Sequence, residues 1–409
     1  MRGISDTLTI GERVSWYRRR RGLSQDVLAG LVGRTTDWLS KAENNRIGLD
    51  RLSVIQTLAD ALGVTGGDLL GDPTLVDWSA DTGPRALPAL RAALMDYRML
   101  TPLFALGHPE GEPIGLIGLS QAITAAMNDY QSARYARVVD RLPELLSNAL
   151  AATRSYQGAE GDEAQRLLAL AYQATAQVMG KVGEAELAWI AADRGLAAAQ
   201  HSGDLAVTGS LLRSVLHCLN STGRFAAALH LLEDAEAILR PTEPESSCEQ
   251  VSVYGALHLA GAMAAARAGD RNAVRDILGR ADQAARRIGM DSNYLWTAFG
   301  PTNVAIHTVA TAGELGDHQI AADLGQRVDT RGLPVERQVR HKLEVARAFA
   351  ARNRCDEALD IVLQAELVAP EQVRHHPMGR ELVLRWIRNS RGRPRNDLTA
   401  LARRLHLVA

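Results

Sequence analysis

A short polar segment near the N-terminus has the residue types that read DNA bases. With 3.6 residues per helical turn, one helix face of this segment carries Thr36, Asp37, Ser40, Lys41 and Asn44. Leu39 and Ala42 fall on the opposite face and are expected to point into a core. A carboxylate such as Asp37 accepts a hydrogen bond from cytosine N4, and an ammonium such as Lys41 donates to guanine O6 or N7. These five side chains therefore have the chemistry needed to contact base edges, and the arrangement of the surrounding helices, described below, leads us to predict that they do.

Basic side chains surround this segment. From residue 9 to residue 51 the chain has nine arginines and lysines against five acidic residues, although the formal net charge of the whole chain is -1. Such a local excess neutralises phosphates and makes binding depend on salt. The arginines predicted to contact phosphates are Arg18, Arg19, Arg34 and Arg46. The run from Arg18 to Arg21 is equally typical of a solvated helix face, so part of it is expected to face water alone.

Short helices must hold these residues in place, and the sequence predicts five, over residues 10–21, 24–32, 35–43, 51–62 and 67–70. The expected caps and turns are Ser24, Gly33, Thr35 or Thr36, Asp50 and Gly63. A helix, a tight glycine turn and a second helix form a helix-turn-helix unit. In that unit the second helix, here the third of the domain, enters the major groove.

The run LSQDVLAGLVGRTTDWLSKAENNRIGLDRLSVIQTLADALGVTGGDLL resembles the phage-repressor (Xre) helix-turn-helix family over about 60 residues. The matching positions are Leu23-Ser24-Gln25, Gly33, Leu39 with Ala42, Glu43-Asn44 and the stretch Ala61 to Val64. The resemblance implies that residues 1–71 form a DNA-binding domain and that Gln25 donates to a phosphate. At Ala42 the family usually has a larger apolar residue, so looser packing is expected there.

For two residues of this domain, the sequence allows either a DNA contact or a structural role. Trp38 is able to touch a thymine methyl group or a sugar, or to pack against a neighbouring helix. Glu43 is able to read a base, or to pair with a nearby arginine. We favour the packing and pairing interpretations, respectively.

The rest of the chain divides into a linker and a helical array. Residues 72–118 are rich in proline and glycine and are predicted to be a linker with one helix, from Ala89 to Leu100. From residue 119 to residue 409, apolar residues recur at helical spacing between short turns, and no strand pattern of useful length occurs. The sequence therefore predicts an all-α protein, with an N-terminal helix-turn-helix domain followed by an α-solenoid.

The solenoid prediction depends on internal repeats. The segment from Leu211 to Ala235, with its turn at Gly223, resembles a tetratricopeptide repeat, and a second match ends at Pro370. Weaker copies turn at Gly183, Gly269 and Gly316. Stacked helix pairs hide the apolar stripe that each pair is unable to bury alone. Closing helices are expected over residues 378–389 and 396–407.

A solenoid of this kind has a concave groove that suits ligand binding. Its predicted ligand residues are Gln173, Gln177, Arg213, His217, Asn220, Phe299, Asn303, His307, Arg340 and Arg347. The resembled family uses such positions to hold peptide backbone or carboxylate, and arginine and asparagine suit that chemistry. The scarce aromatics near residue 299 are either part of this pocket or part of the core. The copy turning at Gly269 has Leu259, Met263 and Ala266 at groove positions, so the groove is expected to be partly apolar.

Composition excludes several classes of protein. The chain has 409 residues, 46% of them hydrophobic and 23% charged, so it is able to bury a large core. Cys218, Cys248 and Cys355 are too few for a disulfide framework or a cysteine metal site. The adjacent His375 and His376 diverge on a helix, and we expect a surface pair and no metal there. No catalytic motif, signal peptide or apolar span occurs, so we expect no enzyme, no cofactor and no membrane contact, and a cytoplasmic location.

These observations predict a sequence-specific transcriptional regulator that binds double-stranded DNA, with a palindromic operator as the expected target. Regulators that pair these two domains sense peptide pheromones in Gram-positive bacterial quorum sensing, so the resemblance implies a peptide or small-molecule effector and a homodimer. The alternative is a DNA-localised scaffold whose repeats hold a partner protein.

Overall fold

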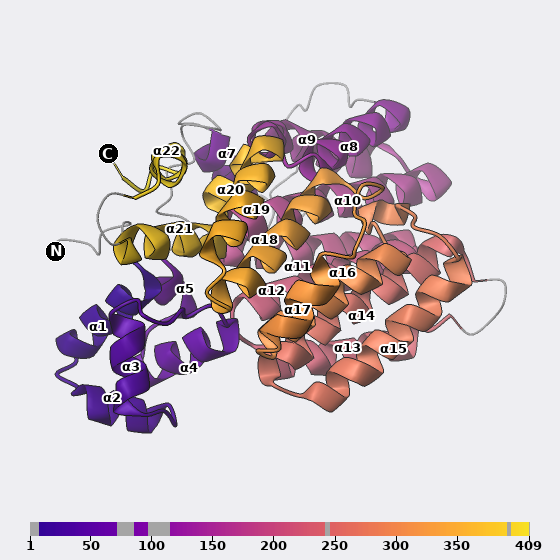
Figure 1. Cartoon of the computed structure of the whole chain (residues 1–409). Coiled ribbons are helices and arrows are strands. Elements are labelled where there is room, and N and C mark those ends of the chain that lie inside the picture. Colours follow the sequence, from indigo (N-terminus) through magenta and orange to yellow (C-terminus); the bar gives the residue numbers. More distant parts are fainter. Residues whose placement is uncertain (1–7, 72–85, 97–114, 242–245, 391–393, 409) are drawn as a thin grey trace.

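The protein is all-α over the residues that the computed structural model describes, which are 8–71, 86–96, 115–241, 246–390 and 394–408 (Figure 1). Those residues contain no strand. Two parts are evident: a small N-terminal domain and a larger body of stacked helices against which it lies.

The N-terminal domain consists of α1 (Ile10–Arg20), α2 (Gln25–Leu31), α3 (Thr36–Glu43), α4 (Leu52–Leu62) and α5 (Gly66–Leu70). Ser24 caps α2 and Thr35 caps α3, as predicted, and Gly63 ends α4 with a φ of 57°. Asp50 does not cap α4: the N-cap residue is Arg51, and no side chain accepts its first amides. The Asp50 carbonyl is instead bound by the body, as described below.

Small residues bring α1 and α3 together in the core of this domain. Leu39 and Ala42 are both buried, as the helical spacing predicts. A Cβ atom added to Gly11 would lie 2.1 Å from the carbonyl oxygen of Ala42. The two helices therefore meet backbone to backbone, and the packing at Ala42 is close, contrary to the looser packing expected from the sequence.

The body begins earlier than the linker prediction placed it. Helix α7 covers Ala86–Leu94, not residues 89–100, of which 97–100 lie outside the described residues. Its buried face, formed by Ala86, Leu90 and Leu94, packs against α9 (Tyr135–Ser155) and α11 (Ala185–Ser202). Because α7 contributes to the core of the body, it is part of that structure and does not serve as a free connection.

The remaining helices of the body follow in chain order: α8 (Leu116–Gln131), α10 (Gly158–Val182), α12 (Leu205–Ser221), α13 (Phe225–Leu239), α14 (Cys248–Ala268), α15 (Arg271–Ile288), η4 (Tyr294–Trp296), α16 (Pro301–Glu314), α17 (His318–Gly325), α18 (Val335–Ala351), α19 (Cys355–Val368), α20 (Pro370–His375), α21 (Pro377–Asn389) and α22 (Asn396–Arg404). Successive helices pack as antiparallel pairs, and the predicted turns at Gly183, Gly223, Gly269 and Gly316 all lie between them with positive φ. One apolar cluster runs from α7 to α22, and a second fills the space among α12 to α16. Stacking therefore buries the apolar stripes, as the repeat pattern predicts.

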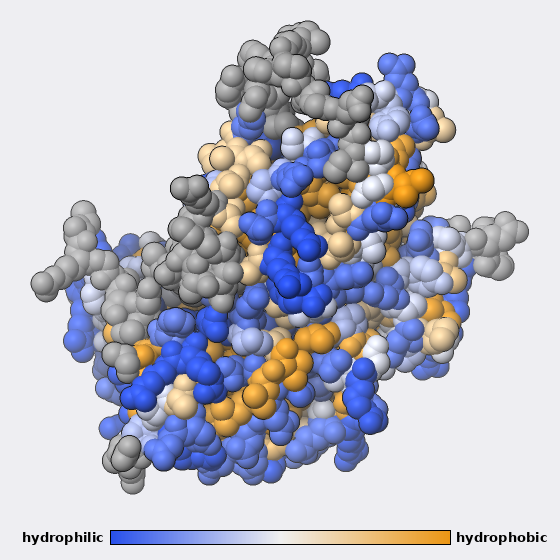
Figure 2. All heavy atoms as spheres, turned by 90° about the horizontal axis from the view of Figure 1, so that it is seen from above, coloured by the Kyte–Doolittle hydropathy of each residue, from blue (hydrophilic) through white to orange (hydrophobic). Residues whose placement is uncertain are grey.

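The outer surface is largely hydrophilic on the face shown in Figure 2, where apolar side chains form only short bands. Exposed large apolar side chains are spread over separate helices, for example Ile117 on α8, Ile238 on α13 and Leu367 on α19. Among the described helices, none combines the length and the apolar character needed to cross a bilayer.

Candidate DNA-binding surface and polar cavity

Helix α3 presents most of its predicted base-reading residues to solvent. Thr36, Asp37, Lys41 and Asn44 are exposed, and Ser40 is half-buried. Lys41 Nζ lies 2.6 Å from Asp37 Oδ2, a pairing of side chains one helical turn apart. The pair places a donor and an acceptor side by side on the exposed face, which is the arrangement needed to meet the edge of a guanine–cytosine pair.

The outer two residues of this set are held by local hydrogen bonds. Thr36 Oγ1 donates to Asp26 Oδ1 at 3.0 Å, and Asn44 Nδ2 donates to the Ser40 carbonyl at 2.7 Å. These contacts limit the rotamers of Thr36 and Asn44 before any ligand is present.

Two residues predicted to contact phosphates make hydrogen bonds within the domain. Arg18 is buried, and its Nε and Nη2 donate to the two carboxylate oxygens of Glu43 at 2.5 and 2.8 Å. Gln25 Nε2 donates to Glu43 Oε2 at 2.7 Å. Burial opposes ionisation of Glu43, but these hydrogen bonds keep its pKa below the ordinary value. Arg18 and Gln25 thus stabilise α1, α2 and α3 against one another, and Glu43 takes the pairing role that we favoured.

The other predicted phosphate contacts remain at the surface. Arg19, Arg34 and Arg46 are exposed. The Arg34 guanidinium lies 5.3 Å from the ring centre of Trp38, and Trp38 itself packs against the apolar core of the domain. Trp38 therefore has the packing role and also supports an arginine beside α3.

The body holds the N-terminal domain by its other side. Ile10 N donates to Glu381 Oε2 at 2.9 Å, and Asn389 Nδ2 donates to the Asn45 carbonyl at 2.7 Å. Helix α4 packs against α14. In the described part of the chain, none of the polar contacts between the two parts involves Thr36, Asp37, Ser40 or Lys41. The part of α3 that carries these four predicted base-reading residues is therefore left open by the docked body.

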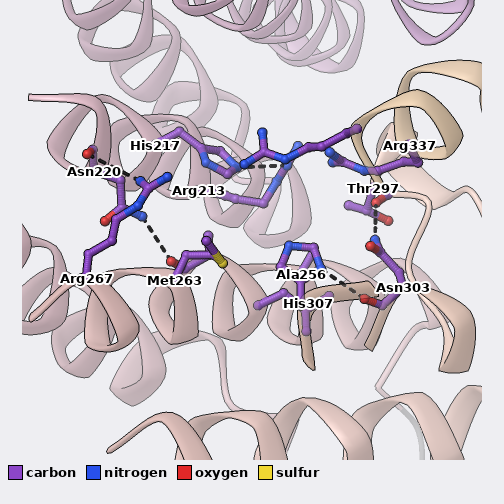
Figure 3. A pocket seen from close by; sticks show the side chains of 13 residues that line it. Arg213, His217, Asn220, Ala256, Met263, Arg267, Thr297, Asn303, His307 and Arg337 are labelled. Carbon is purple, nitrogen blue, oxygen red and sulfur yellow. Dashed lines mark hydrogen bonds between the residues drawn. The ribbon is translucent and has the colours of Figure 1, made fainter. Parts of the chain in front are cut away.

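A polar cavity of about 40 Å³ lies in the body, between α12, α14, α16 and α18 (Figure 3). Its lining consists of Arg213, His217, Asn220, Ala256, Leu259, Ala260, Met263, Arg267, Thr297, Asn303, His307, Arg337 and Arg340. The volume has room for roughly three water molecules. Leu259 and Met263 give the cavity the partly apolar wall that the sequence predicts.

The structure brings six of the ten predicted ligand residues together in this lining: Arg213, His217, Asn220, Asn303, His307 and Arg340. They come from three helices, α12, α16 and α18, that are far apart in the chain. The spacing of these residues along each helix allowed us to predict them, and the stacking of the three helices brings them together.

The other four predicted ligand residues lie elsewhere. Gln173 is buried against η4, where its Nε2 lies 3.5 Å from the Leu295 carbonyl, and Gln177 is half-buried on the same helix outside the cavity. Phe299 is fully buried beneath Gly255, where an added Cβ atom would lie 1.9 Å from the ring. It is a core residue because only a glycine leaves space for its ring against α14. Arg347 faces the N-terminal domain, as described next.

Arg267 and Arg337 line the cavity and were not predicted. Arg337 precedes Arg340 by one helical turn on α18, so the spacing of the two could have identified it. Arg267 lies near the end of α14, one residue beyond the apolar groove positions of the repeat that turns at Gly269. No helical spacing from another predicted residue indicated it. The adjacent His375 and His376 were expected at the surface, but His375 is buried, and His376 is half-buried and caps α21.

Ionic contacts connect this cavity to the N-terminal domain. Arg267 Nε lies 3.7 Å from Glu314 Oε1, and the same oxygen lies 3.2 Å from Arg347 Nη1. Arg347 Nη1 also donates at 3.0 Å to the carbonyl of Asp50, in the segment between α3 and α4. Burial opposes ionisation of Glu314, but Arg347 and Arg267 hold its pKa below the ordinary value. A buried network thus reaches from the cavity wall to the segment that follows α3.

Comparison with known families agrees with the N-terminal architecture. Residues 9–70 match the family model described as a helix-turn-helix domain. The N-terminal domain is a helix-turn-helix domain, and helix-turn-helix domains are typical of DNA-binding regulators. No curated protein and no solved structure matches the chain.

Proposed function

We propose that the protein is a cytoplasmic, non-enzymatic transcriptional regulator of the Xre type, whose tetratricopeptide-like body senses an effector and forms a homodimer. The helix-turn-helix match and the open face of α3 support DNA binding. The observation that carries the sensing role is the buried network Arg267–Glu314–Arg347, which ends on the Asp50 carbonyl.

The mechanism follows from where that network ends. A ligand that binds next to Arg267 changes the electrostatic potential at Glu314 and Arg347. Arg347 in turn binds the segment between α3 and α4. In a dimer, two recognition helices fit consecutive major grooves only near one helical turn of DNA, about 34 Å, or a multiple of it. The ligand controls DNA affinity if it binds one docking arrangement better than the other.

DNA recognition is tested by selecting duplexes from a random pool with the purified full-length protein. We expect one enriched motif, with two symmetric half-sites spaced by one turn or a multiple of it. Sedimentation of the complex should give two protein chains per duplex. Recovery of no motif over random competitor DNA would overturn the proposal, and recovery of a stable partner protein as the condition for DNA binding would favour the scaffold alternative.

The sensing role is tested with Glu314→Gln, which keeps the shape and removes the charge. We expect this variant to bind the selected duplex while small-molecule and peptide fractions of the cell extract no longer change its affinity. The matched control is Glu236→Gln, because Glu236 also pairs with two arginines, Arg240 and Arg280, but lies outside the network. An unchanged response in Glu314→Gln would remove the network from the mechanism.

A further inference from the structure

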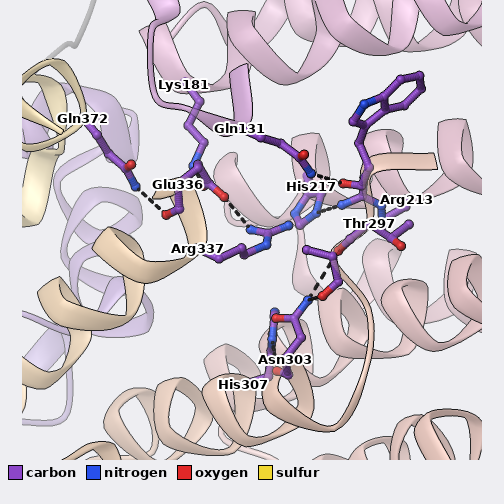
Figure 4. Close-up of polar contacts among 12 residues, drawn as sticks. Gln131, Lys181, Arg213, His217, Thr297, Asn303, His307, Glu336, Arg337 and Gln372 are labelled. Carbon is purple, nitrogen blue, oxygen red and sulfur yellow. Dashed lines mark hydrogen bonds and ion pairs between the residues drawn. The ribbon is translucent and has the colours of Figure 1, made fainter. Parts of the chain in front are cut away.

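The walls of the cavity carry more positive than negative charge. Four of the lining residues are arginines: Arg213, Arg267, Arg337 and Arg340. The nearby carboxylate of Glu336 is already bound by Lys181 and by Arg337, the latter at 3.1 Å (Figure 4). Among the described residues, no carboxylate lies within ion-pair distance of Arg213 or Arg340. The cavity thus contains cationic groups that have no counter-charge among the residues that the structure describes.

Arg213 is the most isolated of these groups. Its side chain is buried, with 4% of the residue exposed, and its Nε has no hydrogen-bond partner in the described part of the protein. Its Nη1 lies 3.4 Å from His217 Nε2, which accepts because a guanidinium has no acceptor atom. Burial and the nearby Arg337 lower the pKa of Arg213 to about 10, so it remains charged at neutral pH. A buried cation without a counter-charge is costly, and an anion in the cavity would remove that cost.

Two amides complete the polar lining. The Nδ2 groups of Asn220 and Asn303 donate to the carbonyls of Ala260 and Ala298 at 3.0 and 2.9 Å. Their Oδ1 atoms are buried and have no partner within the described structure. These oxygens are fixed as acceptors, and they suit the hydroxyl groups of a protonated or partly organic ligand.

We propose that this cavity binds the tetrahedral oxoanion of phosphate or a phosphate monoester, through Arg213, Arg267 and Arg340. The cavity volume of about 40 Å³, room for roughly three water molecules, limits the bound group to a small anion. Guanidinium groups match phosphate in charge and in hydrogen-bond geometry. A carboxylate has one charge fewer to offset the unpaired arginines.

This assignment deepens the proposed sensing role and depends on it. Arg267 lines the cavity and also begins the network to Asp50. An oxoanion that attracts Arg267 competes with Glu314, which is then free to bind Arg347 alone. The protein would therefore respond to the charge of the effector, and that charge would change how the helix-turn-helix domain docks on the body.

The test is calorimetric titration of the purified full-length protein at constant ionic strength with three probes: inorganic phosphate, glycerol 3-phosphate and acetate. We expect saturable binding of a phosphate probe and at least tenfold weaker binding of acetate. Binding of inorganic phosphate equal to or tighter than that of the ester indicates free phosphate as the source, and tighter binding of the ester indicates a phosphorylated effector. Acetate binding as tight as the phosphate probes, or no saturable binding at millimolar concentrations, would overturn the assignment.

Two substitutions test whether the bound anion lies in the cavity. Arg213→Met and, at the half-buried rim, Arg340→Gln should each weaken phosphate binding at least tenfold. The control is Arg275→Gln, which removes an exposed arginine of α15 outside the cavity and should leave binding unchanged. Without phosphate, Arg213→Met should melt no lower than the wild type, because the substitution removes an unpaired charge.

Phosphate binding that survives both cavity substitutions would place the anion elsewhere and refute the assignment. The selected duplex separates this failure from that of the proposed function. If the wild type recognises the duplex but binds no phosphate, only the assignment of the ligand fails. If it recognises no duplex, the proposed function fails whatever the anion does.

Discussion

Two buried arginines in this molecule have opposite surroundings. In the helix-turn-helix domain, Arg18 meets both carboxylate oxygens of Glu43, at 2.5 and 2.8 Å, and donates also to the Leu23 carbonyl. In the body, Arg213 has no carboxylate partner among the described residues, and a neutral histidine is its nearest acceptor. The contrast shows that burial of an arginine does not by itself reveal its role; the presence of a counter-charge does.

The contrast extends to the two parts as wholes. In the N-terminal domain the buried charges are paired, and the unpaired charges, such as Arg19 and Arg46, face solvent where DNA is able to reach them. In the body, Arg213 and Arg340 line the cavity without a carboxylate partner among the described residues. The first arrangement suits a large external polyanion, and the second suits a small one that must enter.

The largest effect is expected from Glu43→Gln, which tests whether Arg18 is structural. It leaves Arg18 buried without its counter-charge, and breaking a buried pair costs about 3 to 5 kcal/mol. The free energy of unfolding from denaturant titration, followed by the fluorescence of Trp16 and Trp38, measures this loss. A loss no greater than that of the exposed control Asp26→Asn would remove the distinction between Arg18 and Arg213.

Lys41→Ala or Asp37→Ala should relax the preference for one base pair of the operator. A good side-chain contact to a base edge contributes about 1 to 3 kcal/mol of discrimination. Affinities for the selected duplex and for its single-base variants measure it. Unchanged sequence preference in both substitutions would move base reading away from the exposed pair on α3.

Docking of the two parts should weaken as pH rises, by roughly 1.4 kcal/mol for each unit by which burial raises the pKa of Glu381. Burial raises the pKa of Glu381 to about 7 in the docked state, while Ile10 N, Arg385 and Arg13 oppose the rise and Glu12 adds to it. In the docked state the Glu381 carboxyl therefore keeps its proton up to a higher pH than a carboxyl with the ordinary pKa of 4.5 does. Stability from this group is full below about pH 4.5 and is lost as pH approaches 7.

Glu381→Gln tests that interpretation, because the amide is neutral at every pH. Thermal unfolding between pH 5 and pH 8 should show a smaller decline in the variant than in the wild type. An identical decline in both proteins would assign the pH dependence to other groups.

The smallest effect is expected from Arg19→Ala. Removing one phosphate contact should weaken all duplexes to a similar extent and reduce the slope of log affinity against log salt concentration by about one. Arg20→Ala serves as the comparison, because the Arg20 guanidinium already lies 5.0 Å from the ring of Trp16. A loss confined to one sequence would contradict a phosphate role for Arg19.

The sequence by itself determined the features that depend on neighbours in the chain. The capping residues Ser24 and Thr35, the end of α4 at Gly63 and the repeat turns at Gly183 and Gly223 were all predictable, because a cap or a left-handed turn depends on a few adjacent residues. Helical spacing also placed Leu39 and Ala42 inside the domain.

Tertiary structure alone decided which polar residues meet. Arg18 and Glu43 are 25 positions apart, and the sequence favoured an arginine partner for Glu43 without indicating which arginine it is. Arg213, Arg267 and Arg340 come from three helices of the stack, and Arg347, expected beside them, points to Asp50 instead. The periodicity of a helix determines the face on which a side chain lies. The residues that this face contacts depend on which distant helices pack against it, and the sequence pattern does not indicate that packing.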